Sequence, residues 1–221
     1  MILAYETSTD VCSVAYQNKE GAIFEKRIQG KSFHSDNLFL FTQELMKEHG
    51  CTIDKMEAVL VSNGPGSYTG LRIATSAIKG IFFKTHVQVY EVETLAGLAC
   101  SLMGENQGII HSIIDARRSH VYHKKFRVDD NLETITELQL LQISEMESIL
   151  KKGHKIVGTG LDRISADKLR GIEIFGSKNI SAKNLLVLYN RFFNSRYIKK
   201  IPLNKLVPTY FNSNQVNNSK V

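Results

Sequence analysis

The strand-like and helix-like segments of this chain follow the same order twice, and that repeat restricts the possible folds more than any other feature. The first copy begins with three short apolar and β-branched runs separated by tight turns, which predict three antiparallel strands. Helices and strands then alternate. We expect strands at 2–5, 12–16, 22–28, 58–62 and 87–90, and helices at about 36–49, 71–84 and 95–103. Ser35 or Asp36 would cap the first helix, Gly50 would end it, and Thr94 would cap the third.

The second copy repeats this order from residue 109. We expect strands at 109–114, 121–128, 134–141, 156–157 and 172–175, and helices at 144–151, 161–169 and 181–193. Ser144 and Glu147 have the spacing of a capping box. The order βββαβαβα is the ribonuclease-H-like layout, and two copies in tandem predict the α/β architecture of the actin-like (ASKHA) ATPases, with a ligand cleft between the halves. The expected halves are 1–104 and 105–221, with the helix at 181–194 and the tail packing back onto the first.

Composition and charge exclude several classes of protein. No apolar run reaches the roughly 18–20 residues of a membrane span, and the segment Met1–Glu6 lacks the basic and apolar regions of a secretory signal. The cysteines Cys12, Cys51 and Cys100 are isolated in the sequence, which predicts reduced thiols in a cytoplasmic protein. A net charge of +6 is compatible with a nucleic-acid partner, and a lysine-rich soluble protein is the simpler interpretation.

A glycine-rich turn, NGPGSYTG at residues 63–70, joins a predicted strand to a predicted helix. Turns of this kind can bind phosphate through exposed backbone N–H groups. This one is not a P-loop, because no Gly-Lys-Ser/Thr follows it. It is closer to a dinucleotide-binding turn, with Glu91 or Glu93 as the ribose-binding acid. Against that interpretation, three strands precede the turn and Pro65 has no N–H to offer a phosphate.

A structural role explains the same turn without a ligand. Gly64 and Gly66 would allow a sharp bend, Ser67 or Thr69 would cap the helix, and Gly70 would permit close packing. We therefore expect the three glycines to form a structural loop, and a dinucleotide-binding domain is kept as an alternative.

Two acidic residues occupy equivalent places in the two copies. Glu6 and Asp115 each end the first strand of a half and precede a tight hairpin. In the actin-like layout these hairpins face each other across the cleft, where paired carboxylates could hold magnesium. The first hairpin lacks glycine, so its N–H groups cannot approach a phosphate closely. The residues of this degenerate nucleotide cleft are Glu6, Thr7, Ser8, Asp115 and Arg117. We expect no bound metal or cofactor, and an ATP-dependent actin-like enzyme is the second alternative.

The histidines do not predict a catalytic metal site. His34 and His49 stand at the two ends of the first helix, some four turns apart, so they cannot share an ion. His120 and His123 lie three residues apart on a predicted strand, so their side chains point to opposite faces. We expect surface or capping roles for these histidines, and no catalytic residue.

Two predicted helices carry more apolar residues than a stripe against a sheet needs. Leu38–Phe41 is an apolar run that spans a full turn, and residues 71–83 are mostly apolar. Excess apolar surface on a globular chain marks an interface. Complete burial of both helices would explain the pattern equally well.

Three stretches resemble the TsaB (YeaZ) family: ILAYETST at 2–9, NGPGSYTGLR at 63–72, and IDARR at 114–118 followed by Val121-Tyr122. The lone His34, the Gly158-Thr159-Gly160 turn and Pro208-x-Tyr210 fit the same family, and the likeness is specific over roughly the first 125 residues. The resemblance implies an actin-like fold and a non-catalytic partner of TsaD. With the ATPase TsaE, that pair places threonylcarbamoyl on N6 of A37 in tRNA, a modification called t6A37.

The resemblance also implies where such a chain pairs. Members of the family form a heterodimer with TsaD, and a homodimer when alone, through the two apolar helices described above. The implied interface residues are Leu38, Phe39, Phe41, Thr42, Leu45, Leu71, Arg72, Ala74, Thr75 and Ile78.

The chain departs from the family pattern at two positions. Glu6 stands where the family has Asp, which weakens a metal–nucleotide role, and Asn212, in a polar tail, stands where the family has Arg. Basic residues could contact tRNA phosphates, although a solvated face is the simpler interpretation. They are Arg117, Arg118, Lys124, Lys125, Lys199, Lys200 and Lys205.

Overall fold

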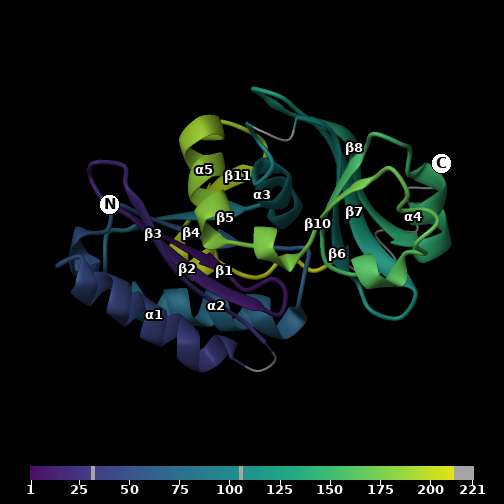
Figure 1. The fold of residues 1–221 in the computed structure, drawn as a ribbon. Coiled ribbons are helices and arrows are strands. Elements are labelled where there is room, and N and C mark those ends of the chain that lie inside the picture. Colours follow the sequence, from purple (N-terminus) through teal and green to yellow (C-terminus); the bar gives the residue numbers. More distant parts are fainter. Residues whose placement is uncertain (31–32, 105–106, 212–221) are drawn as a thin grey trace. The chain divides into compact units, whose positions relative to one another are not determined.

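The structure is a computed structural model of the chain, drawn in Figure 1, and it describes residues 1–30, 33–104 and 107–211. Residue contacts divide the chain into two units. Unit 1 consists of Met1–Gly97 and Ser181–Thr209, and unit 2 of Leu98–Ile180 with the residues from Tyr210 onward. The division lies after Gly97, whereas the sequence pattern placed it after residue 104. Asn212 and the polar tail lie outside the described residues.

Unit 1 is built on a six-stranded mixed sheet in the order β11-β5-β4-β1-β2-β3. The first three strands form an antiparallel meander, β4 runs parallel to β1, β5 runs parallel to β4, and β11 runs antiparallel to β5. The strands are β1 (Ile2–Glu6), β2 (Val11–Gln17), β3 (Ile23–Gln29), β4 (Ala58–Ser62), β5 (Gln88–Val92) and β11 (Ile198–Ile201). The helices are α1 (His34–Glu48), α2 (Tyr68–Ile81), α3 (Thr94–Cys100), which contains the boundary of the unit, and α5 (Ala182–Phe192).

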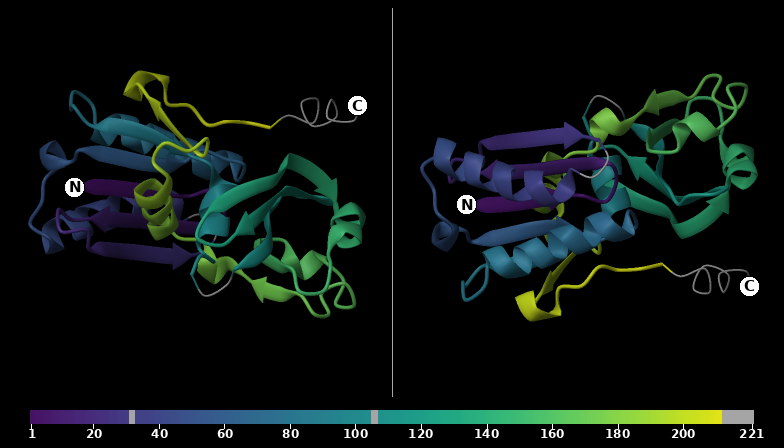
Figure 2. Two further views of the ribbon diagram at one scale, coloured as in Figure 1. Left: turned by 90° about the horizontal axis from the view of Figure 1, so that it is seen from above. Right: turned by 90° about the horizontal axis from the view of Figure 1, so that it is seen from below.

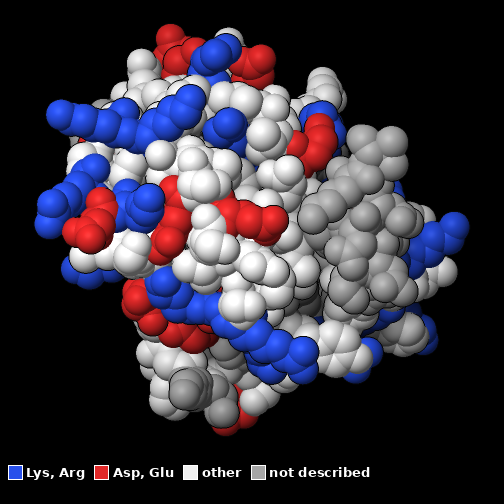
Figure 3. Space-filling model, turned by 90° about the vertical axis from the view of Figure 1, so that its right-hand side faces the viewer, with Lys and Arg blue, Asp and Glu red and all other residues white. Residues whose placement is uncertain are grey.

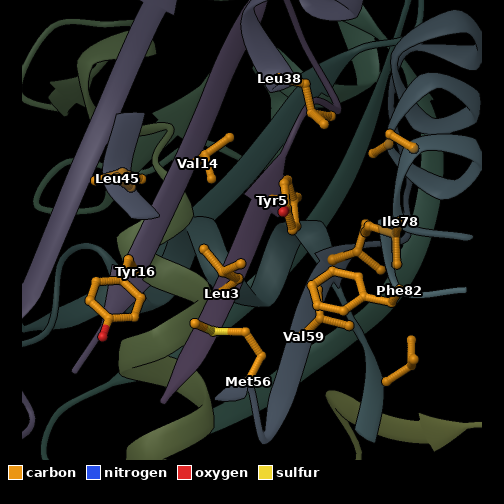
Figure 4. Close-up of a cluster of buried hydrophobic side chains, with 14 of the residues drawn as sticks. Leu3, Tyr5, Val14, Tyr16, Leu38, Leu45, Met56, Val59, Ile78 and Phe82 are labelled. Carbon is orange, nitrogen blue, oxygen red and sulfur yellow. The ribbon is translucent and has the colours of Figure 1, made fainter. Parts of the chain in front are cut away.

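Helices cover both faces of this sheet. α1 and α2 lie side by side on one face, and α5 crosses the other face (Figures 1 and 2). The core between the sheet and the α1–α2 pair is drawn in Figure 4, and it includes Leu3, Val14, Leu38, Ile78 and Phe82. Burying such side chains supplies most of the free energy that holds the layers together, at about 25 cal/mol for each Å² removed from water.

Most elements of unit 1 follow from local sequence. The bounds of β4 agree with the prediction, and all five of its residues are buried. α1 ends before Gly50, whose φ of +58° suits a residue without a Cβ atom. The prediction that Ser35 or Asp36 caps the N-terminus of α1 is wrong. Its N-cap is Phe33, and the helix begins at His34, whose ring Nε2–H donates to the carbonyl of Thr9 at 2.9 Å.

The sequence pattern does not predict β11, whose four residues, IKKI, are too short a run to show a period. β11 forms because its backbone pairs with β5, with Lys199 opposite Glu91 and Lys200 opposite Tyr90. Ile201 also packs against the main core of unit 1. An edge strand that carries lysines is protected against pairing with further strands.

Unit 2 contains a second mixed sheet, in the order β10-β9-β6-β7-β8. Its first three strands are antiparallel, β9 runs parallel to β6, and β10 runs parallel to β9. The elements are β6 (Gly108–Asp115), β7 (His120–Val128), β8 (Leu132–Gln142), α4 (Ile143–Ile149), β9 (Lys155–Gly158) and β10 (Glu173–Phe175). A small core that includes Ile113, Met146 and Ile156 lies between this sheet and α4.

The predicted helix at 161–169 is wrong, and the predicted capping box is displaced by two residues. Ser165 donates both its backbone N–H and its hydroxyl to Glu147 Oε1, at 2.7 and 2.8 Å. Its N–H is therefore not available for a hydrogen bond within a helix. The segment forms a 3-10 turn at Leu161–Arg163 followed by tight turns. Glu147 is thereby committed to Ser165, and the capping box of α4 is made by Gln142 and Glu145.

Two further features concern the described residues as a whole. Cys12, Cys51 and Cys100 are buried and free of disulfides. None of the helices in residues 1–30, 33–104 and 107–211 has the length and apolar character needed to cross a lipid bilayer.

A partly buried carboxylate attaches the N-terminus of α5 to the sheet of unit 1. Glu25 Oε1 accepts hydrogen bonds from the hydroxyls of Ser13 and Ser181, at 2.5 and 2.6 Å, and the Ala182 N–H donates to Ser13 Oγ at 2.8 Å. Lys183 lies 3.7 Å from the other carboxylate oxygen. This network ties residues that are more than 150 positions apart in the chain.

Glu25→Ala should lower the free energy of unfolding by about 2–3 kcal/mol, because the buried hydroxyl of Ser13 and the partly buried hydroxyl of Ser181 lose a charged acceptor. Urea unfolding followed by circular dichroism measures the change. Glu20→Ala, at an exposed turn of the same hairpin, is the control and should stay within about 0.5 kcal/mol of the wild type. Equal stability of both variants would contradict an anchoring role for Glu25.

Candidate functional site

The glycine-rich loop 63–70 packs its backbone against the turn between β1 and β2. A Cβ atom on Gly66 would overlap the carbonyl oxygen of Ser8, and one on Gly70 would overlap the carbonyl oxygen of Thr7. The Ser67 N–H donates to that Ser8 oxygen at 2.6 Å, and Thr7 Oγ1 donates to the Gly70 carbonyl at 2.9 Å. The two glycines are therefore required by close approach of one backbone to another.

Four N–H groups of this loop, those of Asn63, Gly64, Ser67 and Gly70, are bonded inside unit 1. Gly64 N–H donates to Thr94 Oγ1 at 3.1 Å, so the hydroxyl expected to cap α3 holds the loop instead. Gly70 N–H donates to Ser67 Oγ at 3.2 Å, which makes Ser67 the cap of α2. Asn63 N–H donates to the carbonyl of Val92. A phosphate at this loop would have to displace these bonds, which tells against both a phosphate-binding and a dinucleotide-binding role.

The loop also holds the C-terminal part of unit 1. The Asn63 side-chain amide donates to Thr209 Oγ1 at 2.9 Å, and the Thr209 N–H donates back to the Asn63 carbonyl at 3.2 Å. Loop 63–70 is thus a junction of four segments: the β1–β2 turn, the end of β5, the start of α3 and the strand-like segment before residue 210.

Gly70→Ala should lower the free energy of unfolding by about 1–3 kcal/mol, because the new methyl group must push apart two backbones. Gly80→Ala, in the same helix, is the matched control, since a Cβ atom there meets no atom within 4 Å. It should raise stability by about 0.5–1 kcal/mol through helix propensity. Chemical denaturation measures both, and a neutral Gly70→Ala would contradict the close approach.

Glu6 lies beneath this loop and is almost fully buried, with 3% of its surface exposed. Its Oε1 accepts a hydrogen bond from the Ser8 N–H at 2.7 Å. Burial raises the pKa of the Glu6 carboxyl, and hydrogen bonds from Ser8 and Ser62 oppose that rise. The Ser8 and Ser62 hydroxyls are buried without a geometrically good partner among the described residues. A protonated Glu6 can donate to one of these oxygens, whereas a carboxylate cannot.

This environment does not suit a magnesium-bound nucleotide. Magnesium is held by ionised carboxylates, and the ion keeps several of its water ligands. Glu6 is instead enclosed by protein atoms in a site that favours its neutral form. No group of three or more His, Cys, Asp or Glu side chains in the described part of the chain is arranged to hold a metal ion.

Glu6→Gln should lower the dependence of stability on pH. The folded pKa of Glu6 is raised, so its contribution to stability is present below the unfolded pKa of about 4.3 and is lost as pH rises through the folded pKa. Glutamine keeps the acceptor for Ser8 and cannot ionise. The variant should therefore gain on the wild type in urea midpoint between pH 4 and pH 8. Glu20→Gln is the exposed control, and a constant offset in both variants would contradict the prediction.

Asp115 occupies the equivalent place in unit 2. Its Oδ1 accepts a hydrogen bond from the Arg117 N–H at 2.8 Å, and its own N–H donates to Thr159 Oγ1 at 2.9 Å. Arg163 forms an ion pair with the same carboxylate. Arg117 and Arg118 adopt left-handed φ values of +67° and +52°, which cost free energy in residues other than glycine. The Asp115 side chain is exposed and paired with Arg163, and its alignment with Glu6 across a cleft stays a prediction.

The residues predicted for the partner interface divide into buried and exposed groups. Phe39 and Arg72 are exposed, Phe41 is half-buried, and the Arg72 guanidinium stacks on the Tyr68 ring at 3.9 Å. Leu40, which was not among the predicted residues, is 46% exposed. The other seven lie in the interior of unit 1 and cannot contact a partner while the unit is folded: Leu38, Thr42, Leu45, Leu71, Ala74, Thr75 and Ile78.

The histidines of α1 have structural contacts. His34 bonds to Thr9, and the ring of His49 lies 3.8 Å from that of Phe24 and also stacks on Tyr16. The prediction of a surface or capping role is wrong for His123. Its side chain is fully buried in unit 2 and contacts His111.

The basic residues proposed for tRNA differ in their exposure and partners. Lys124 is buried, with its Nζ atom 3.7 Å from Glu137, and Lys199 lies opposite Glu91 in the β5–β11 pair. Arg117 and Arg118 are exposed. On the face shown in Figure 3, Lys and Arg side chains lie among Asp and Glu side chains rather than in a field of one sign. Direct contact with tRNA stays a prediction.

Comparisons with known proteins agree on one family. Residues 29–184 match the family described as TsaD: tRNA N6-adenosine threonylcarbamoyltransferase. The chain is 27% identical over 220 residues to the tRNA threonylcarbamoyladenosine biosynthesis protein TsaB of Buchnera aphidicola subsp. Baizongia pistaciae, and the alignment covers 96% of this chain and 97% of that protein. It is 26% identical over 180 residues to the TsaB protein of Bacillus subtilis, covering 80% of this chain and 77% of that protein.

A solved structure confirms the fold. YeaZ from Pseudomonas aeruginosa superposes with a TM-score of 0.79 at 24% identity, covering 95% of this chain and 99% of that one. The predicted α/β class and its actin-like layout are thereby confirmed. The sequence likeness and the fold likeness extend over nearly the whole chain.

Proposed function

The chain belongs to the TsaD family, in which it resembles the TsaB (YeaZ) proteins along its length, and from this membership we propose that it acts in the synthesis of threonylcarbamoyladenosine in tRNA. In this proposal it is the non-catalytic partner of TsaD and works with TsaE. The single observation that carries the partner role is the exposed apolar surface on α1.

The positions of the histidines support a non-catalytic role. In the catalytic relatives, two histidines one helical turn apart hold a metal ion, and such spacing places both rings on one face of the helix. In this chain His34 and His49 stand at opposite ends of α1 and are engaged by Thr9 and Phe24. Glu6 is buried and bonded to Ser8, so it is not open to a substrate, whereas the exposed Asp115 is paired with Arg163.

The surface proposed for TsaD consists of Phe39 and Leu40 on α1 with Tyr68 and Arg72 on α2, and we call it the α1–α2 surface. Phe39 and Leu40 are 47% and 46% exposed, although they lie in the middle of a helix. α1 and α2 are neighbours on one face of the sheet (Figure 2). Large adjacent apolar side chains that the fold leaves uncovered mark a site of association.

The α1–α2 surface suggests how the chain would influence TsaD. A partner that binds one conformation of an enzyme better than others shifts the population toward that conformation. The chain would therefore stabilise a competent form of TsaD without contributing a catalytic group. When TsaD is absent, two copies of the chain would cover the same surface by forming a homodimer.

Size-exclusion chromatography with light scattering tests the proposed function. The chain alone should run as a dimer, and an equimolar mixture with TsaD from the same organism should give a one-to-one complex. Failure of the wild-type chain to bind TsaD would overturn the partner role itself.

Phe39→Asp with Leu40→Asp should weaken binding to TsaD at least about 100-fold, because charges would replace the central apolar contacts. Isothermal titration calorimetry measures the affinity. Both side chains are exposed, so the variant should keep the circular dichroism spectrum of the wild type. Leu38→Asp is unsuitable, because Leu38 is in the core.

The matched control changes two exposed apolar residues of unit 2, Ile135→Asp with Ile174→Asp. It should bind TsaD with unchanged affinity. If the Phe39/Leu40 variant also binds normally while the wild type forms the complex, the partner role survives and the α1–α2 surface is wrong.

A further inference from the structure

Three histidines of unit 2 form a continuous chain of hydrogen-bonded rings. His111 Nδ1 lies 3.0 Å from His123 Nε2, and His111 Nε2 lies 2.9 Å from His154 Nδ1. His111 and His123 are fully buried, and His154 is partly exposed. The chain therefore leads from the interior of unit 2 to its surface.

Strand register brings the three rings together. In the antiparallel β6–β7 pair, His123 lies opposite Ile113 and Lys125 lies opposite His111, so His111 and His123 are diagonal neighbours on one face. In the parallel β6–β9 pair, Lys155 lies opposite Ile110, which places His154 beside β6 just before β9 begins. Ile113 belongs to the core beneath α4, so the rings lie on the face of the sheet that carries this core.

When the three rings are neutral, each ring carries one N–H group. Each of the two ring-to-ring hydrogen bonds then contains one proton. The middle ring, His111, then has one N–H, so it donates across one contact and accepts across the other. All N–H groups must consequently point the same way along the chain. If they point inward, His154 presents a bare Nε2 at the partly exposed end and can take up a proton from water.

An additional proton has no favourable place in this cluster. Burial lowers the pKa of His111 to about 3 and that of His123 to about 4, and it also lowers the pKa of His154. The charged groups that act on the rings are Lys125 on β7 and Lys151 after α4, and both are cations. Gln139 on β8 favours the charged form of His123 by a hydrogen bond, which only partly offsets burial.

We propose that His111, His123 and His154 act as one proton-sensing element, which holds the segment between α4 and β9 against the sheet when neutral and releases it when protonated. If the cluster takes up two additional protons, two N–H groups face each other at one of the ring-to-ring contacts, and that hydrogen bond is lost. A single additional proton adds a positive charge to a cluster on which Lys125 and Lys151 already act. Either charge is relieved when His154 moves outward, because its ring is the most exposed of the three and lies on a turn rather than within a strand.

The segment that would move is short and locally bonded. His154 N–H donates to the carbonyl of Lys151 at 2.9 Å, and Gly153 N–H donates to the carbonyl of Gly171 at 2.9 Å. Opening the turn would break the His111–His154 bond and the Gly153–Gly171 bond, while β6 and β7 keep their own pairing. The Gly153 amide is therefore a direct reporter of this motion.

Amide hydrogen exchange on the full chain, read by NMR between pH 7.5 and pH 5, tests the proposal. Because the folded pKa values are lowered, the closed form is favoured above the unfolded pKa of about 6.5 and is progressively lost as pH falls below it. The opening constant at Gly153, corrected for intrinsic exchange, should rise about tenfold per pH unit for each proton taken up. Amides of β1 and β4 in unit 1 should show no such rise.

His154→Gln separates the element from general acid denaturation. Glutamine can still hydrogen-bond to His111 but cannot titrate, so the slope of the logarithm of the opening constant against pH should fall by about one. His86→Gln, at an exposed position of unit 1, should leave the slope unchanged. An unchanged slope in His154→Gln would overturn the proposal.

Nitrogen-15 NMR of the rings gives a second test that does not depend on the variants. The three rings should stay neutral well below pH 6.5 and should change together when they titrate. Independent titration of all three near pH 6.5 would overturn the proposal, even if His154→Gln proved too unstable to study.

Discussion

The contact between loop 63–70 and the β1–β2 turn is the constraint on which unit 1 depends. Two backbones approach so closely that Gly66 and Gly70 have no space for a Cβ atom next to the carbonyls of Ser8 and Thr7. The approach fixes the end of β1 relative to the start of α2, and the same loop bonds to Thr94 and Thr209. A turn whose sequence resembles a phosphate cradle therefore holds four segments of its own unit together, and it covers Glu6 as a consequence.

The two acidic residues that end the first strand of each unit have different environments. Glu6 and Asp115 stand at equivalent positions, and each accepts the N–H of the residue two places further on. Burial raises the pKa of Glu6 and favours its neutral form, whereas Asp115 is exposed and forms an ion pair with Arg163. The two carboxyl groups are therefore held by different physical means. The proposed role of this chain is recognition, and the uncovered Phe39 and Leu40 would provide a surface for it.

Unit 2 differs from unit 1 in how its buried polar side chains are hydrogen-bonded. In unit 1 the buried Ser13 hydroxyl is tied to a carboxylate, that of Glu25. In unit 2 the rings of His111, His123 and His154 bond to one another, with Lys125 and Lys151 nearby. A cluster of titratable groups that bond to one another makes the local structure sensitive to their protonation.

The sequence by itself determined the order of strands and helices in the first copy, the α/β class and the family, because apolar periodicity, the glycine-rich turn and the motifs near Glu6 and Asp115 are local signals. Tertiary structure alone decided four other matters. β11 exists only because β5 offers it an edge, and residues 161–169 do not form a helix because Glu147 captures Ser165. Leu40 is exposed beside the buried Leu38, and three histidines from separate segments meet. Both outcomes depend on which face each element turns toward its neighbours. A run of apolar residues or a set of isolated histidines in the sequence does not specify that face.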